Sequence, residues 1–268
     1  MFLLLTVSLI MTSICPAGNA SLDRKSKFVK AESFYLNNDL FMSEKILKNI
    51  IKEPVVDDVK FKAILTLIDI AQKEGDRSLF KDVLSSLRGI DKNTSNEYNS
   101  VLYAIGKYLL QNAEYKTAIG FLNLVDKKSQ IYPQTVYIKA SCFAGIKRYS
   151  DAIFNYEIVI RMKNEYINKD IRDAAILGKA RVYVMMKKYD LALDEYQSID
   201  SLSKHYIRSL EETARLFLAK KDYDQALSQL EALVLINKKL YRLMAQVQTT
   251  LQLFIKECLQ CNGVLQML

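Results

Sequence analysis

The chain has 268 residues, of which 50% are apolar and 25% are charged. This composition is typical of a globular protein, and with only 3 Pro and 8 Gly it argues against long loops and low-complexity linkers. The formal net charge of +8 favours acidic partners such as anionic protein surfaces, lipid headgroups or nucleic acid. Because the basic residues are scattered beside acidic ones, with no run of five or six like charges, the charge alone does not separate a solvated surface from a partner site.

The first twenty residues read as a leader. Residues 2–14 form a hydrophobic region of 13 residues, which is too short to span a bilayer and fits the core of a secretory signal. Gly18 and Ala20 supply the small residues needed for cleavage after position 20. We therefore expect residues 1–20 to be a signal peptide and the mature protein to be periplasmic or secreted. A retained anchor, a lipoprotein modified at Cys15 and a chance apolar start are the alternatives.

The next segment, residues 21–96, is predicted to hold two divergent helix pairs. Apolar residues recur at helical spacing on both sides of a turn in residues 22–53 and again in residues 57–88. The two turns are predicted at residues 37–39 and at Gly75-Asp76, where the residue types favour a change of direction.

Residues 97–235 contain one pattern four times. An alanine in the second helix of each unit recurs 34, 40 and 34 residues apart, at Ala118, Ala152, Ala192 and Ala226. A small residue stands twelve positions before each alanine, at Gly106, Ala140, Ala180 and Ala214. A large apolar residue stands nine positions before it, at Leu109, Phe143, Tyr183 and Phe217. The first helices are predicted to begin near Glu97, Pro133, Asp170 and Ser203. A fixed period of this length indicates a repeat architecture, in which each unit buries its apolar face by stacking on its neighbours.

These marks resemble the tetratricopeptide repeat, a helix–turn–helix unit of 34 residues. The family's small positions, its aromatic position and its tyrosine all have counterparts here, whereas its tryptophan is missing because the chain contains no Trp. The resemblance implies an all-α, right-handed helical-repeat solenoid of about six helix pairs plus a C-terminal helix. Residues 236–268 would supply that capping helix and a tail.

No catalytic constellation is visible. The only histidine is His205, so neither a Ser-His-Asp nor a Cys-His arrangement can form, and no Gly-rich phosphate-binding motif occurs. The cysteines are Cys15, Cys142, Cys258 and Cys261, and the single C-x-x-C pair lacks two further zinc ligands. We expect a protein that is not an enzyme and that has neither a metal nor a cofactor.

The resemblance also implies a concave face lined by the first helices. Transfer of the family's face positions selects six candidate partner-binding residues, namely Tyr103, Lys107, Tyr137, Arg181, Arg208 and Arg215. Tyrosines beside cations suit a peptide or helix with acidic character, held by aromatic contact and charged hydrogen bonds. The alternative is that these residues are simply exposed on their helices.

The leading functional hypothesis is a protein-protein interaction scaffold of the bacterial cell envelope. It would bind a segment of another protein in an assembly, secretion or motility complex, which includes complexes at a membrane. The alternative is a binder of nucleic acid or of anionic surfaces, which the net charge supports and which the dispersed lysines and the leader oppose.

Overall fold

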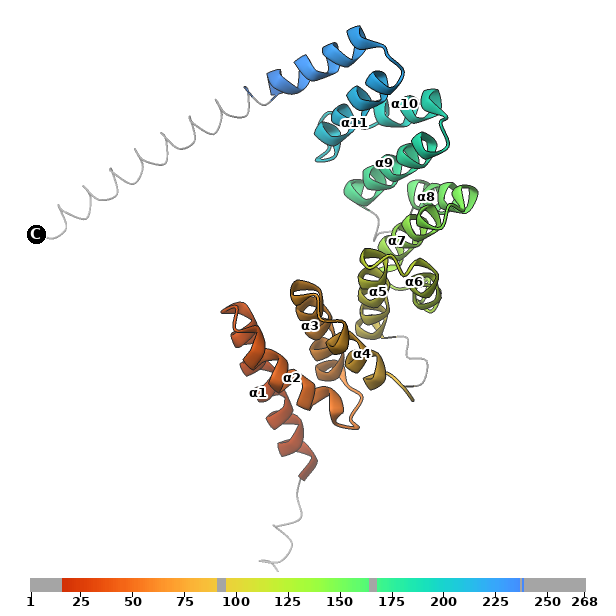
Figure 1. Ribbon diagram of the computed structural model, residues 1–268. Coiled ribbons are helices and arrows are strands. Elements are labelled where there is room, and N and C mark those ends of the chain that lie inside the picture. The colour runs from red at the N-terminus through yellow and green to blue at the C-terminus, as the bar shows by residue number, and fades with distance from the viewer. Residues whose placement is uncertain (1–15, 91–94, 164–167, 237, 239–268) are drawn as a thin grey trace, which may run out of the picture. The chain divides into compact units, whose positions relative to one another are not determined.

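The computed structural model describes residues 16–90, 95–163, 168–236 and 238. All the regular secondary structure within these ranges is helical, with eleven helices from α1 to α11 and a further helix over residues 223–236. They form six successive pairs joined by short turns (Figure 1). The chain is therefore an all-α helical-repeat protein, as predicted. Residues 239–268, which include the predicted C-terminal helix, Cys258 and Cys261, lie outside the described residues, as do residues 1–15.

The chain divides into two compact units, Met1–Asn155 and Tyr156–Leu268, and the boundary falls within α8 (Tyr149–Arg161). Described entirely within the first unit are α1 (Pro16–Leu36), α2 (Leu40–Lys52), α3 (Asp58–Glu74), α4 (Arg77–Ser86), α5 (Asn96–Gln111), α6 (Tyr115–Leu122) and α7 (Tyr132–Gly145). The second unit holds α9 (Lys169–Met185), α10 (Tyr189–Gln197), α11 (Tyr206–Ala219) and the helix over residues 223–236. Helix α1 begins at Pro16, so the predicted cleavage after residue 20 would fall within its first turns.

The turn inside each pair has the same backbone geometry throughout the described chain. One residue adopts positive φ in every pair, at Asn38 (61°), Gly75 (69°), Ala113 (59°), Lys147 (62°), Lys187 (58°) and Lys221 (62°). This left-handed conformation closes a helix by directing the following N–H groups back to its last carbonyls. The backbone N–H of Asp76, for example, donates to the carbonyl of Ala71 at 2.9 Å. The two pairs that lack the tyrosine and alanine marks thus share the turn of the four clear repeats.

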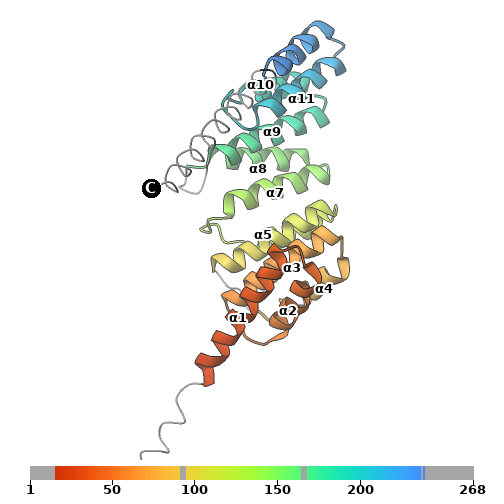
Figure 2. The same cartoon turned by 90° about the vertical axis from the view of Figure 1, so that its left-hand side faces the viewer.

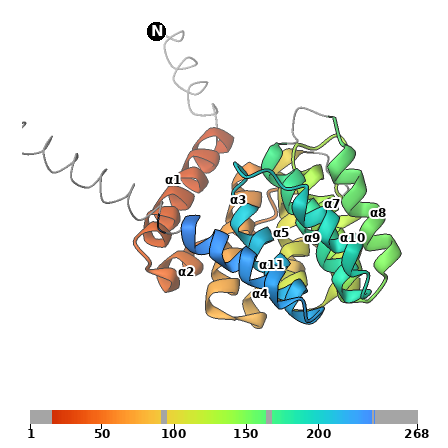
Figure 3. The same cartoon turned by 90° about the horizontal axis from the view of Figure 1, so that it is seen from above.

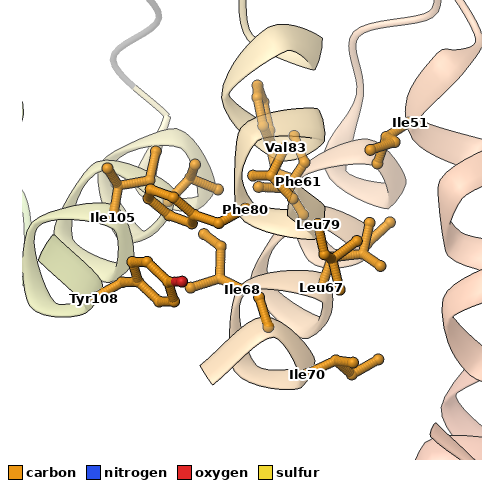
Figure 4. Close-up of a cluster of buried hydrophobic side chains, with 14 of the residues drawn as sticks. Ile51, Phe61, Leu67, Ile68, Ile70, Leu79, Phe80, Val83, Ile105 and Tyr108 are labelled. Carbon is orange, nitrogen blue, oxygen red and sulfur yellow. The ribbon is translucent and has the colours of Figure 1, made fainter. Parts of the chain in front are cut away.

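In the first unit the core lies between α3, α4 and α5, and α1 and α2 lie side by side next to it (Figures 2 and 3). Phe80 stacks on Tyr108, with ring centroids 3.8 Å apart and an angle of 16° between the rings. Ile68 and Ile105 lie close to this pair (Figure 4). Apolar side chains on successive turns of α3, α4 and α5 thus bury one continuous face, which is what stacked helix pairs require.

The second unit has its own core between α9, α10 and α11. Leu177, Ala180, Ala192, Tyr196, Ile199 and Leu216 form it, and each is at most 4% exposed. Its helices α9 and α10 pack against each other, and α10 packs against α11.

The predicted helix contacts are confirmed at the small residues. Ala118, Ala152 and Ala192 are completely buried and Ala226 is 1% exposed. The small residues twelve positions upstream are buried as well, and a Cβ added at Gly106 would meet the side chain of Leu122. Three first helices begin one residue before their predicted starts. The fourth, α11, begins at Tyr206 rather than near Ser203, because the backbone between Asp200 and Tyr206 makes turns.

Candidate partner-binding surfaces

The six candidate residues all lie on the first helices of their pairs, and they divide between the two units. Tyr103 and Lys107 are on α5 and Tyr137 is on α7, in the first unit. In the second unit, Arg181 is on α9, and Arg208 and Arg215 are on α11. That all six share one face remains a prediction, and the two sets are taken separately below.

In the first unit the two tyrosines are neighbours. Tyr103 is half-buried, and burial together with the nearby Tyr137 raises the pKa of Tyr103. Both side chains pack against the core of this unit, so a part of each ring supports the fold. Lys107, one turn after Tyr103 on α5, is exposed. This set offers two aromatic surfaces beside one ammonium group.

A polar cluster on α1 and α3 lies near Lys107, and the sequence analysis did not select it. The ammonium of Lys73 donates to the hydroxyl of Tyr35 at 2.6 Å and pairs with Asp69 at 3.0 Å, and the Tyr35 hydroxyl also donates to Asp69. Burial opposes ionisation of Asp69, but these hydrogen bonds and the charges of Lys73 and Lys107 lower the pKa of Asp69. The surface near Lys107 therefore carries both signs of charge.

In the second unit the buried carboxylate of Glu212 holds two of the candidate arginines. Arg181 donates to both oxygens of Glu212, with N···O distances of 2.6 to 3.0 Å. The Nε of Arg208 donates to the same carboxylate at 2.9 Å, and the hydroxyl of Tyr196 donates to it at 2.8 Å. The side chain of Glu212 is only 10% exposed, so this network is largely shielded from water.

The network shifts two pKa values in opposite directions. Burial disfavours the charged form of Glu212, but the hydrogen bonds and charge of Arg181, with help from Tyr196 and Arg208, lower its pKa. Burial, followed by the negative charge of Glu212, raises the pKa of Tyr196. The carboxylate is thus ionised and the phenol protonated over the whole physiological range, as hydrogen bonding between them requires.

Arg181 and Arg208 therefore have an internal role that their position in the repeat did not reveal. Sequence spacing contains part of the signal, because Arg208 and Glu212 are four residues apart on one helix, where opposite charges attract. Arg215 differs from both. It is exposed, and no carboxylate of the described residues lies within ion-pairing distance of it.

A cleft of about 350 Å³ opens between α9, α10 and α11. Its walls are mainly apolar, and its lining consists of Arg181, Val184, Met185, Tyr189, Tyr196, Glu212, Arg215, Leu216 and Ala219. Met185 is 57% exposed, so an apolar surface is accessible there. The cleft combines the size and lining of a site for one apolar side chain with a cation, Arg215, at its edge.

Other chemistry is absent from the part of the chain that the structure describes. No group of three metal-binding side chains occurs within it, and none of its helices is long and apolar enough to cross a membrane. Cys142 is buried with a free thiol, and burial raises its pKa to about 12, so it is an inert core residue. His205 is half-buried just before α11, and its side chain makes no capping hydrogen bond.

Comparison with solved structures identifies the fold. No protein-family model matches the sequence, and no curated protein does either. PilF of Pseudomonas aeruginosa is 17% identical, with a TM-score of 0.55 over 77% of this chain and 88% of that one. A chain from Podosopora anserina made of nearly identical TPR-like repeats is 14% identical, with a TM-score of 0.55 over 69% and 98% of the two chains. The protein has the tetratricopeptide-repeat (TPR) fold. MamA is also similar, at 19% identity and a TM-score of 0.50 over 65% of this chain and 95% of that one.

The TPR fold explains why every candidate lies on a first helix. In this chain α5, α7, α9 and α11 are the first helices of successive repeats, and each candidate occupies a position of its helix that the repeat leaves at least partly exposed. Fold similarity at these identities does not transfer a ligand, because one fold supports many functions. The functional argument therefore rests on the side chains of the cleft and of the tyrosine pair.

Proposed function

We propose that this TPR protein is a non-enzymatic scaffold that binds a segment of another protein against its first helices. The observation that carries the proposal is the cleft between α9, α10 and α11, where Val184, Met185 and Leu216 offer apolar surface and Arg215 offers a cation. A partner segment with an apolar side chain beside a carboxylate matches both. The apolar contact supplies most of the affinity, because an exposed ion pair alone contributes at most about 1 kcal/mol.

The tyrosine pair of the first unit provides a second surface of the same chemistry. Tyr103 and Tyr137 present aromatic surface and Lys107 presents an ammonium group, which again suits a segment of acidic character. Arg181 and Arg208 act differently from the other candidates. They fix the cleft wall through Glu212 and present only the remaining part of their guanidinium groups to a partner.

We propose further that the scaffold works in the bacterial cell envelope, in an assembly, secretion or motility complex. This placement is supported by the leader at residues 1–20 alone. Cell fractionation of the full chain and of a variant without residues 1–20 tests it. The full chain is expected outside the cytoplasm and the shortened chain inside it, and a full-length product that stays in the cytoplasm would rule out the envelope role. Binding of nucleic acid through the net charge is not favoured, since many of the cations already pair with carboxylates of the chain itself.

Photocrosslinking tests the cleft directly. A photoreactive amino acid replaces Met185, which lines the cleft, or Leu202, which is 88% exposed and does not line it. We expect position 185 alone to yield a discrete adduct in cells, with a partner peptide that contains acidic residues. The same adduct should decrease at least tenfold when Arg215→Glu is added. Equal adducts from both positions, or an adduct that is unaffected by Arg215→Glu, would remove the cleft from the binding surface.

A further inference from the structure

A second cavity lies in the first unit and has a different chemistry from the cleft. It measures about 560 Å³ and is formed by α2, α3, α4 and the α2–α3 connection. Its lining consists of Lys48, Ile51, Lys52, Glu53, Pro54, Lys60, Asp82, Ser85 and Ser86. Three lysines and two serines in one cavity provide hydrogen-bond donors from three helices, and a cavity of this size can hold a small organic molecule.

Lys60 is the unusual member of the set. It is 5% exposed, its ammonium donates to the backbone carbonyl of Glu53 at 3.0 Å, and no carboxylate of the described residues lies within 4.0 Å of it. Burial and then the charge of Arg24 lower the pKa of Lys60, and the more distant Asp57 and Glu53 do not offset this. A lysine ammonium has three N–H donors, so two of them face the cavity without a partner from the described chain. A buried cation in this position lacks the counter-charge that would normally offset its loss of water.

The carboxylates of the cavity do not supply that counter-charge, because each already pairs with another cation. Arg24 pairs with Glu53 and with Asp57, both at 2.5 Å, and Lys48 pairs with Asp82 at 2.9 Å. Arg24 itself is 5% exposed, and its Nη2 is buried without a hydrogen-bond partner. The region thus contains two buried basic side chains with unused donors.

Two further groups complete the donor set from the cavity rim. Lys52 is exposed and has no ion-pair partner among the described residues, so its ammonium can reach a bound anion. The hydroxyl of Ser86 donates to the carbonyl of Val83 at 2.7 Å, which directs its proton away, whereas the exposed Ser85 keeps a hydroxyl proton to donate.

We propose that this cavity binds a phosphate group, with Lys60 at its base and Lys52 and Ser85 at its rim. Phosphate fits because it carries nearly two negative charges and three acceptor oxygens, and can therefore accept from several donors that converge from different helices. The cavity volume leaves room for the remainder of a phosphorylated small molecule beside the phosphate. This site is in the first unit and does not depend on the proposed partner-binding function.

Calorimetric titration of the full chain with inorganic phosphate at constant ionic strength tests the site. We expect saturable binding to the wild-type chain and a dissociation constant at least tenfold higher for Lys60→Met and for Lys52→Glu. Lys62→Glu is the matched control, because Lys62 is exposed on the same helix α3 and does not line the cavity. It should bind phosphate as the wild type does.

Two comparisons make the outcomes decisive. Lys60→Met also removes the hydrogen bond to Glu53, so its folding is checked by thermal unfolding, while Lys52→Glu changes the rim and leaves that bond in place. Vesicles with and without phosphatidic acid distinguish the sources of phosphate. Sedimentation of the chain with phosphatidic acid vesicles alone, lost in Lys52→Glu, would assign the site to a lipid headgroup. Binding that is absent for both probes, or equal in Lys52→Glu and Lys62→Glu, would overturn the proposal.

Discussion

The ring of Tyr156 fills the space that a side chain would need at Gly178. A Cβ built on Gly178 would lie 2.5 Å from Cζ and 2.6 Å from Cε1 of that ring, and Tyr156 is only 4% exposed. The same relationship occurs between Tyr115 and Gly145, where the distance would be 2.6 Å. In both, a tyrosine from a second helix packs on a glycine of the following first helix, so successive repeats are joined by an aromatic ring seated on bare backbone.

Gly178→Ala should therefore destabilise the second unit. The added methyl group cannot fit unless the buried ring of Tyr156 moves, and overpacking of this kind costs about 1–3 kcal/mol. Urea unfolding followed by circular dichroism measures the change. Gly120→Ala is the control, because Gly120 lies in helix α6 and an added Cβ there meets nothing within 4 Å. That substitution should leave the stability unchanged or raise it by up to about 1 kcal/mol. A Gly178→Ala variant as stable as the parent would show that the ring has room to shift.

Ala152→Leu should destabilise the first unit for a related reason. Ala152 is completely buried, so three additional carbons would have to displace side chains in a packed interior, at a cost of about 1–3 kcal/mol. Thermal unfolding provides the measurement. Phe154→Ala, two residues further along α8, is the comparison, because Phe154 is 64% exposed and its loss should change the stability by no more than about 0.5 kcal/mol. Equal melting temperatures for Ala152→Leu and the parent would contradict the repeat register.

Glu212 should make the stability of the second unit depend on pH in the acid range. Its pKa is lower in the folded chain than in the unfolded one, so the unfolded state binds more protons. The contribution of Glu212 is fully present above its unfolded pKa of about 4.3 and is lost as the pH falls through the lower folded pKa. Glu212→Gln should cost about 1–3 kcal/mol at pH 7, since it weakens the hydrogen bonds of Arg181 and Tyr196.

The measurement is urea unfolding of both chains between pH 7 and pH 3. The difference in unfolding free energy between wild type and Glu212→Gln should shrink as the pH falls below about 4.3. A difference that stays constant with pH would mean that the charge of Glu212 does not stabilise the fold.

The repeat unit could be predicted from the sequence because its marks are local and periodic. Ala118 and Ala192 recur at fixed distances, and both are completely buried. The role of Arg181 could not be predicted in this way. Its position in the repeat gives the face of α9 on which it lies, but its partner Glu212 comes from the next first helix, 31 residues later. The position of a residue in the repeat thus predicts exposure, whereas pairing between repeats depends on which side chains happen to meet.

The same limit applies to Lys60 and to Tyr35. Lys60 lies in a pair without the tyrosine and alanine marks, and nothing in the local sequence distinguishes its buried ammonium from the exposed one of Lys62. Tyr35 reaches Lys73 across 38 residues. Both contacts depend on how neighbouring helix pairs pack, and a single sequence does not contain that information.

The two arginines that line the cleft should respond differently to charge reversal. Arg181→Glu would place a second carboxylate against the buried Glu212, so we expect loss of stability as well as loss of binding. Arg215→Glu alters an exposed residue, so its unfolding curve should match that of the parent. It should mainly slow association with an acidic partner and reduce the salt dependence of that rate.

Tyr137→Ala should weaken partner capture more than any single change of a cation, because aromatic contact contributes more affinity than an exposed charge. The experiment compares the three variants with the partner identified by crosslinking at position 185, after circular dichroism has established that each is folded. Lys116→Glu, an exposed change on helix α6 away from the first helices, is the control and should bind normally. If all of the variants captured the partner as the parent does, the binding surface would have to lie elsewhere than on the first helices.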